Sequence, residues 1–157
     1  MINSEFVSIL KLLNERLESR DINWAITGST NFALQGLAYE PNDIDIQTNQ
    51  KGAYEIESLF KVYIRRPVSY SSNGSIRSHF GEMVINGVTV EIIGDIEKLV
   101  DGEWEKAPNL NEIIELINVV NLKLPVLSLE YEIEAYRKLG REDKAELLFK
   151  HLRNMDN

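Results

Sequence analysis

The sequence contains no cysteine, only four prolines and two histidines, and no long apolar run. Without cysteine, disulfides, thiol catalysis and thiolate zinc sites are excluded. No apolar stretch reaches the roughly 18 residues of a membrane span, so we predict no transmembrane helix. The first residues, MINSEFVSILKLL, lack the basic region of a signal peptide. These absences together predict a cytoplasmic protein with no membrane partner.

Basic residues are also scarce, because 17 lysines and arginines face 25 aspartates and glutamates and give a net charge of −8. This balance argues against an extended nucleic-acid footprint, which needs a basic face, although a local basic patch stays open. The length of 157 residues and the hydrophobic content of 43% suit one domain with a real core. We expect a single domain over residues 1–157, with its core at 22–95 and a C-terminal helical segment at 126–155.

The stretch Trp24–Thr48 organises the rest of the chain. Trp24–Thr27 is a short apolar run typical of a strand, Gly28-Ser29 ends it, and Thr30–Gly36 follows as a short helix. After a loop containing a proline, Asp43–Ile46 alternates strictly between polar and apolar residues. Successive strand side chains point to opposite faces, so the two aspartates are expected side by side on one face.

Two neighbouring carboxylates repel each other and are costly near a core unless a cation lies between them. Mg²⁺ suits such a pair, because it binds one or two carboxylates and completes its octahedron with substrate phosphates and water. A helix beginning near Ser29 would add free N–H groups, and Gly28 would let a phosphate approach the backbone closely. An anion site beside Asp43 and Asp45 indicates a nucleoside triphosphate site.

The segment Arg77–Ile93 carries the second informative pattern. Asn86-Gly87 between two apolar runs predicts a two-residue hairpin. The resulting register pairs Ile85 with Val88 and places Glu91 on the face of the aspartate pair, directly opposite Glu82. Because like charges opposite each other destabilise a sheet, either Glu82 helps to hold a cation or Gly81 forms a bulge that turns it away. We favour the bulge or a supporting role for Glu82.

Other polar residues have two interpretations each. His79 could bind phosphate or metal or transfer a proton, or it could be satisfied by local hydrogen bonds. Arg65 and Arg66 could contact a triphosphate or an acceptor, although a solvated strand edge is favoured. Basic residues near 137–144, Arg141 among them, could approach a nucleotide or form a solvated helix surface.

Local patterns predict the remaining elements. Ser4, Asp95 and Ser128 are candidate N-cap residues. We expect helices at 4–19, 49–60, 96–100, 111–117, 128–139 and 141–154, strands within 61–69 and at 119–124, and a polar loop at 101–109.

The pattern apolar–Gly–Ser, thirteen residues, then Asp–apolar–Asp–apolar resembles the nucleotidyltransferase superfamily with the polymerase-beta-like fold. The chain is similar to small single-domain bacterial and archaeal nucleotidyltransferases, and its tail, from Val126 to Arg141, resembles the lincosamide nucleotidyltransferase branch. The resemblance implies an α+β (α/β) fold: a mixed sheet of about four to six strands, helices mainly on one face and a C-terminal helical hairpin.

The resemblance also implies a Mg²⁺-dependent transfer of a nucleoside monophosphate from a nucleoside triphosphate to an acceptor hydroxyl. Two Mg²⁺ ions are expected, with Mn²⁺ as a substitute. The acceptor stays open between a small molecule, a protein and an RNA end, and a homodimer partner could complete the site. An inactive nucleotide-binding or antitoxin-like module is the alternative. The implied catalytic and metal-binding residues are Asp43, Asp45 and Glu91, the nucleotide-binding residues Gly28, Ser29 and Thr30, and the supporting residues His79, Glu82, Arg65 and Arg141.

Overall fold

The structure is a computed structural model that describes residues 2–155, and it has the predicted mixed α+β architecture. Its sheet has eight strands, more than the four to six expected, in the order β3-β4-β5-β2-β1-β8-β7, with β6 pairing the end of β5. The pairs β2–β5 and β1–β8 are parallel and the others antiparallel. The helices are α1 Ser4–Leu17, α2 Gly28–Leu34, α3 Gln50–Leu59, α4 Leu129–Lys138 and α5 Glu142–Met155. The strands are β1 Trp24–Thr27, β2 Ile44–Thr48, β3 Ile64–Ser72, β4 Ile76–Ile85, β5 Val88–Val100, β6 Glu103–Glu105, β7 Ile114–Val119 and β8 Leu122–Leu127.

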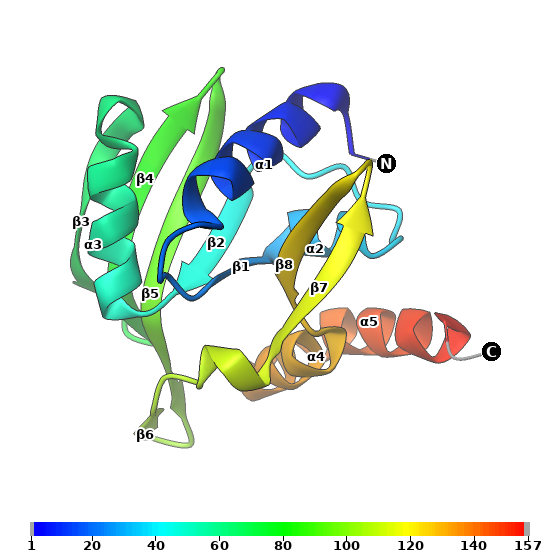
Figure 1. The fold of residues 1–157 in the computed structure, drawn as a ribbon. Coiled ribbons are helices and arrows are strands. Elements are labelled where there is room, and N and C mark those ends of the chain that lie inside the picture. The colour runs from blue at the N-terminus through cyan, green and yellow to red at the C-terminus, as the bar shows by residue number, and fades with distance from the viewer. Residues whose placement is uncertain (1, 156–157) are drawn as a thin grey trace.

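Helices α1 and α3 lie against one face of the sheet (Figure 1) and bury the main core there. The apolar positions of β2 and β5 face this core, and Ile44, Ile46, Val90 and Ile92 have no exposed surface. This confirms the alternation inferred from the sequence. A second cluster joins α2 to the helical hairpin α4–α5 through Phe32, Ile133 and Leu148. The polar positions of β2 and β5 therefore project from the face that α1 and α3 leave uncovered.

The predicted hairpin register is confirmed. Asn86 and Gly87 both have positive φ, +51° and +80°, and Ile85 pairs with Val88, Met83 with Val90 and Glu82 with Glu91. The bulge proposed at Gly81 is wrong for this pair of strands, because the β4–β5 ladder runs through it without a shift.

The bulge near Gly81 lies instead in β3, the other strand that pairs with β4. Between the pairs Arg66–Glu82 and Ser69–Phe80, β3 contains one residue more than β4. A Cβ on Gly81 would lie 2.7 Å from Val68 Cγ2 and 3.0 Å from the Arg66 carbonyl oxygen. A glycine in β4 therefore makes room for the extra residue in β3.

The expected helix at 96–100 and short helix at 111–117 are wrong. Residues 96–100 continue β5, and the segment 111–117 is a 3-10 turn followed by β7. The expected polar loop contains β6. The strand expected at 119–124 agrees with β8 only over its second half, because Val119 ends β7 and residues 120–121 form the turn before β8, which pairs with β7 and β1. Asp95 has a positive φ of +49° and caps a different element, because its carboxylate accepts a 2.9 Å hydrogen bond from the Gln50 N–H of α3.

Side-chain caps mark the starts of α1, α3 and α4, and that of α3 is Asn49, which accepts from the Gly52 N–H at 2.7 Å. Asn3, not the predicted Ser4, caps α1 by accepting from the Phe6 N–H at 2.9 Å. Ser128 caps α4 as predicted, accepting from the Tyr131 N–H at 3.2 Å. The cap places Glu132 in the early part of α4, where this helix meets the start of α2.

Candidate active site

Three carboxylates meet at the junction of β2 and β5. The parallel register puts Asp45 directly beside Glu91, and Asp43 immediately precedes β2. One oxygen from each residue lies within 4.8 Å of the others. The structure thus brings together the trio that the sequence predicted from strand alternation and the hairpin register.

A row of polar side chains crosses five adjacent strands and includes two of these carboxylates. Arg66 of β3 pairs with Glu82 of β4, Glu82 with Glu91 of β5, Glu91 with Asp45 of β2, and Asp45 with Thr27 of β1. Cross-strand partners share a face of the sheet. We refer to these five residues as the polar row.

Asp45 is the most electrostatically strained member of the row. Its burial raises the pKa of its carboxyl to about 8, and the hydrogen bond and charge of Glu91 and the charge of Asp43 act in the same direction. Among the described residues, no hydrogen-bond partner reaches its buried Oδ1. A cluster of carboxylate oxygens with one buried, unpartnered member matches the ligand preference of a hard divalent cation. The residues present therefore fit a metal ion such as Mg²⁺.

The Gly28-Ser29 turn lies directly against Asp45. Gly28 has φ +71°, and a Cβ there would be only 2.8 Å from the Asp45 Oδ2, so both backbone conformation and close approach require glycine. Thr30 is fully buried and donates its hydroxyl to the Asp43 carbonyl at 2.7 Å, which ties α2 to the start of β2. Of the three residues predicted to bind nucleotide, Ser29 and Gly28 are partly exposed, whereas the Thr30 side chain is engaged in the fold.

Glu132 of α4 is a site residue that the sequence reasoning missed. It is 4% exposed and accepts hydrogen bonds from the Thr27 hydroxyl, the Gly28 N–H and the Asn31 side chain, each at 3.0 Å. Burial raises its pKa, and these donors and the charge of Lys98 oppose the rise. The sequence feature that could have identified Glu132 is its position on the apolar face of α4, where a charged residue needs hydrogen-bond partners.

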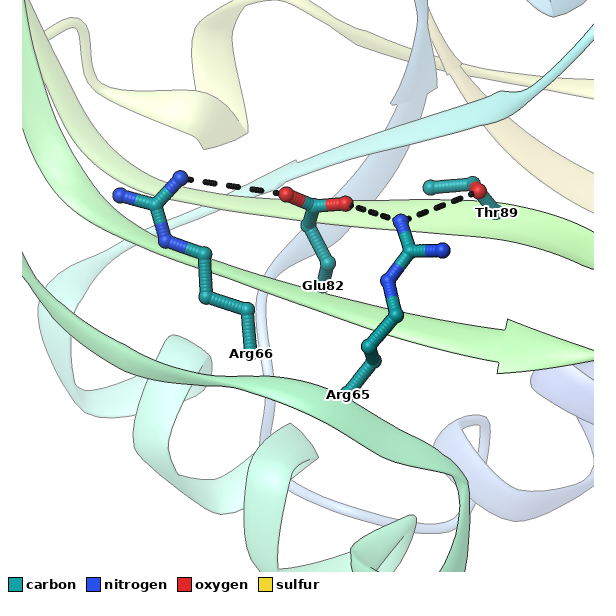
Figure 2. Close-up of polar contacts among 4 residues, drawn as sticks. All are labelled: Arg65, Arg66, Glu82 and Thr89. Carbon is teal, nitrogen blue, oxygen red and sulfur yellow. Dashed lines mark hydrogen bonds and ion pairs between the residues drawn. The ribbon is translucent and has the colours of Figure 1, made fainter.

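The structure places the supporting residues predicted from the sequence on different faces of the sheet. Glu82 forms ion pairs with both arginines of β3, at 2.5 Å from Arg65 Nη2 and 3.8 Å from Arg66 Nη1 (Figure 2). These charges compensate the glutamate that lies opposite Glu91. His79 belongs to the other face of the sheet, because it lies four residues from the core residue Met83 on β4 and so shares its face. Its Nδ1 lies 3.1 Å from the Tyr54 hydroxyl. The local hydrogen-bond interpretation of His79 is therefore the one that the structure supports.

The basic residues at the corner of the α4–α5 hairpin have different partners. Lys138 pairs with Glu105 at 3.0 Å, whereas Arg141 lies 5.4 Å over the ring of Tyr136. Lys144 lies 5.4–5.7 Å over three rings, and burial and then the nearby Arg141 charge lower its pKa. Those rings belong to Phe32, Tyr39 and Tyr136.

Two neighbouring cavities lie on the face of the sheet that carries the carboxylates, and Asp45 lines the smaller one. The smaller cavity, about 140 Å³, is lined by Gly28, Asp45, Glu132 and Tyr136. Gln47 also lines it, and the buried Nε2 of Gln47 has no hydrogen-bond partner among the described residues. The larger, about 380 Å³, lies over β3, β4 and β5. Both are lined by Ile93 and Ile96, so they are neighbours on the carboxylate face.

A mixed sheet with a Gly-Ser turn beside three carboxylates on adjacent strands defines a nucleotidyltransferase fold. Residues 9–151 match the family model described as Aminoglycoside-2''-adenylyltransferase, and the chain belongs to this family. The crystal structure of a protein from Thermotoga maritima, TM1012, provisionally described as a nucleotidyltransferase, is 48% identical with a TM-score of 0.86, over 98% of this chain and 96% of that chain.

More distant solved structures share the fold alone. The lincomycin-bound lincosamide adenylyltransferase LnuA is 13% identical with a TM-score of 0.56, over 94% of this chain and 98% of that chain. ANT(2'')-Ia, in complex with adenylyl-2''-tobramycin, is 12% identical with a TM-score of 0.60, over 98% of this chain and all of that chain. No curated protein sequence matches the chain. Within residues 2–155, no helix has the length and apolar character needed to cross a membrane.

Proposed function

We propose that the protein transfers a nucleoside monophosphate from a nucleoside triphosphate to a hydroxyl group of a small acceptor, in a Mg²⁺-dependent reaction. The observation that carries this proposal is the cluster of Asp43, Asp45 and Glu91 directly beside the Gly28-Ser29 turn. The family description names an adenylyl group, so ATP is the donor to test first.

Asp43, Asp45 and Glu91 would hold the metal, as one ion or as a pair, with Mn²⁺ as a substitute. When bound there, the metal would neutralise charge on phosphate oxygens and lower the pKa of an attacking hydroxyl. The raised pKa of Asp45 supports this assignment, because a cation between the carboxylates would relieve the repulsion that raises it.

The residues around the cluster would orient the nucleotide. Ser29 offers a hydroxyl donor next to Gly28, and Arg141 and Lys144 offer two cations over the ring of Tyr136, which lines the same cavity as Gly28. Lys144, held over aromatic rings, is partly desolvated before any ligand arrives, which would strengthen its attraction to a phosphate.

The acceptor hydroxyl would approach from the side of Glu91. Its oxygen would form a bond to the α-phosphorus while the bond from that phosphorus to the bridging oxygen breaks, and pyrophosphate would leave with both electrons of that bond. The proton of the hydroxyl would pass to Glu91 if this carboxylate acts as the general base instead of holding the metal, because Glu91 pairs with Asp45 on the adjacent strand and lies on the side from which the acceptor approaches.

Calorimetric titration of ATP with and without Mg²⁺ tests the proposal. The unaltered protein should bind ATP only with Mg²⁺, and the double variant Asp43→Asn/Asp45→Asn should lose at least roughly 10–100-fold in affinity. Glu40→Gln removes an exposed negative charge outside the cluster and should bind as the unaltered protein does. Equal binding by the double variant would remove the carboxylate cluster from the nucleotide site.

A further inference from the structure

The larger cavity lies on the same face of the sheet as the carboxylates. Phe80 of β4 pairs with Ile93 of β5, and both line this cavity. This pair is two residues along the strands from the pair Glu82–Glu91, a separation of about 6–7 Å. A molecule in the cavity would therefore reach Glu91 from the side opposite the Gly28-Ser29 turn.

The lining of the larger cavity has a definite chemistry. Phe80, Ile93 and Ile96 supply apolar surface, Ser71 and Ser78 supply hydroxyls, and Arg66 supplies a guanidinium group. The Arg66 guanidinium lies 5.0 Å over the Phe80 ring, and half of its side-chain surface is exposed. Among the described residues, no carboxylate lines this cavity. It suits a flat apolar group next to a negative charge, because a guanidinium binds carboxylates and phosphates with several donors.

The nearest carboxylate outside the cavity is already compensated. Glu82 lies between two guanidinium groups, and Arg65 makes the shorter contact of 2.5 Å and also reaches the Thr89 hydroxyl (Figure 2). The contact of Arg66 with Glu82 is longer, at 3.8 Å. Arg65 thus balances the glutamate, and the Arg66 charge is left to face the cavity.

We propose that the larger cavity binds the acceptor, and that the acceptor is a flat, largely apolar molecule with an anionic group and a hydroxyl. The acceptor role depends on the proposed function, whereas the binding chemistry depends on the cavity alone. A polycation such as the tobramycin of ANT(2'')-Ia would place ammonium groups against Arg66 with no carboxylate in the lining to receive them. The chain therefore shares its family's transfer chemistry but selects an acceptor of opposite charge.

Amide chemical shifts of the ¹⁵N-labelled protein test the proposal, with 4-hydroxybenzoate as the anionic probe and tobramycin as the polycation. 4-Hydroxybenzoate should shift the amides of Ser71, Ser78 and Ile93 saturably, and tobramycin should not. Arg66→Gln should weaken this binding by about threefold to tenfold, as expected for one partly exposed charge-assisted contact. Arg20→Gln, which removes an exposed guanidinium group outside the cavity lining, should leave the affinity unchanged.

Absence of 4-hydroxybenzoate binding, equal effects of the two arginine variants, or tobramycin binding at these amides would each overturn the proposal. A titration of ATP with Mg²⁺ into the same sample separates it from the proposed function. Shifts at Ser29 and Asp45 alone would support both proposals. Shifts by ATP at Ser78 and Ile93 would mean that the nucleotide occupies the cavity, and would overturn the acceptor assignment. No response to ATP, with 4-hydroxybenzoate still bound, would refute the proposed function and leave the anion-binding cavity in place.

Discussion

Replacing Asp45 by asparagine should stabilise the metal-free protein, although it removes a proposed catalytic residue. The carboxyl has its pKa raised from the ordinary 3.8 to about 8 by burial and by Glu91 and Asp43. An acid whose pKa is raised by folding destabilises the folded state increasingly as the pH rises from its ordinary pKa to its folded pKa. An asparagine carries no charge at any pH, so it avoids this penalty and can donate a hydrogen bond to Glu91.

The size of the effect follows from the size of the shift. Each pKa unit corresponds to about 1.4 kcal/mol, which sets an upper bound of about 5 kcal/mol at pH 8. Rearrangement of the cluster lowers this bound, so we expect Asp45→Asn to raise the free energy of unfolding by roughly 2–4 kcal/mol at pH 8. Near pH 4 the difference should be small, because Asp45 is then protonated in the folded state and only about half ionised in the unfolded chain, whose pKa is the ordinary 3.8.

Urea denaturation in the presence of EDTA, from pH 4 to pH 8, measures this difference directly. Glu40→Gln makes the same change of net charge at an exposed site and should alter stability by less than about 0.5 kcal/mol at every pH. Mg²⁺ should then stabilise the unaltered protein more than the Asp45→Asn variant. A variant that is no more stable than the unaltered protein at pH 8 would refute the view that the cluster is strained without a cation.

Substitutions of Gly28 and Glu132 test how the Gly28-Ser29 turn and helix α4 support the carboxylate cluster. Gly28→Ala should destabilise the protein by roughly 1–3 kcal/mol and reduce its stabilisation by Mg²⁺, because the new Cβ meets the Asp45 carboxylate. Gly74→Ala is the control, because Gly74 also has a positive φ but a Cβ there would meet nothing within 4 Å. In thermal melts, Mg²⁺ should stabilise the Gly74→Ala variant as much as the unaltered protein. Equal stabilisation of the two variants by Mg²⁺ would contradict the proposed contact between residue 28 and Asp45. Glu132→Ala should cost roughly 3–5 kcal/mol in urea denaturation, because three buried donors lose their acceptor, and Glu132→Gln should cost clearly less, since it keeps one oxygen. Equal losses in these two variants would contradict this reasoning, because a glutamine that keeps one oxygen acceptor would then preserve none of the stabilisation.

Local patterns were sufficient to predict the carboxylate cluster. The alternation of Asp43–Ile46 and the Asn86-Gly87 turn each depend on the geometry of a few consecutive residues. Once the hairpin register was set, the face of Glu91 followed from counting, and the structure confirms it. A site built from strand ends and tight turns can therefore be predicted from sequence, because its geometry depends on residues that are close together in the chain.

Contacts between distant segments were not predictable in this way. Glu132 reaches Gly28 across 104 residues, and its role depends on how α4 packs against α2. The segment that forms β7 has apolar residues on both sides of an exposed edge strand, so its spacing did not separate strand from helix. Asp95 was assigned to the wrong helix because a cap next in sequence and a cap from a distant strand have the same local signature.

Under the two proposals, the polar row separates the part of the site that would carry the chemistry from the part that would select the acceptor. The carboxylates and the turn belong to β1, β2, β5 and α2, where Thr27, Asp45 and Glu91 pair directly. The groups that would touch an acceptor belong mainly to β3 and β4, at the edge of the sheet. The register of β3 shifts twice there, and the extra residue between Ile64 and Arg66 accompanies the reach of Arg65 and Arg66 to the same glutamate. Edge strands can change their side chains and register without disturbing the central pairs. Membership of an aminoglycoside adenylyltransferase family therefore constrains the reaction of this chain more tightly than it constrains the acceptor.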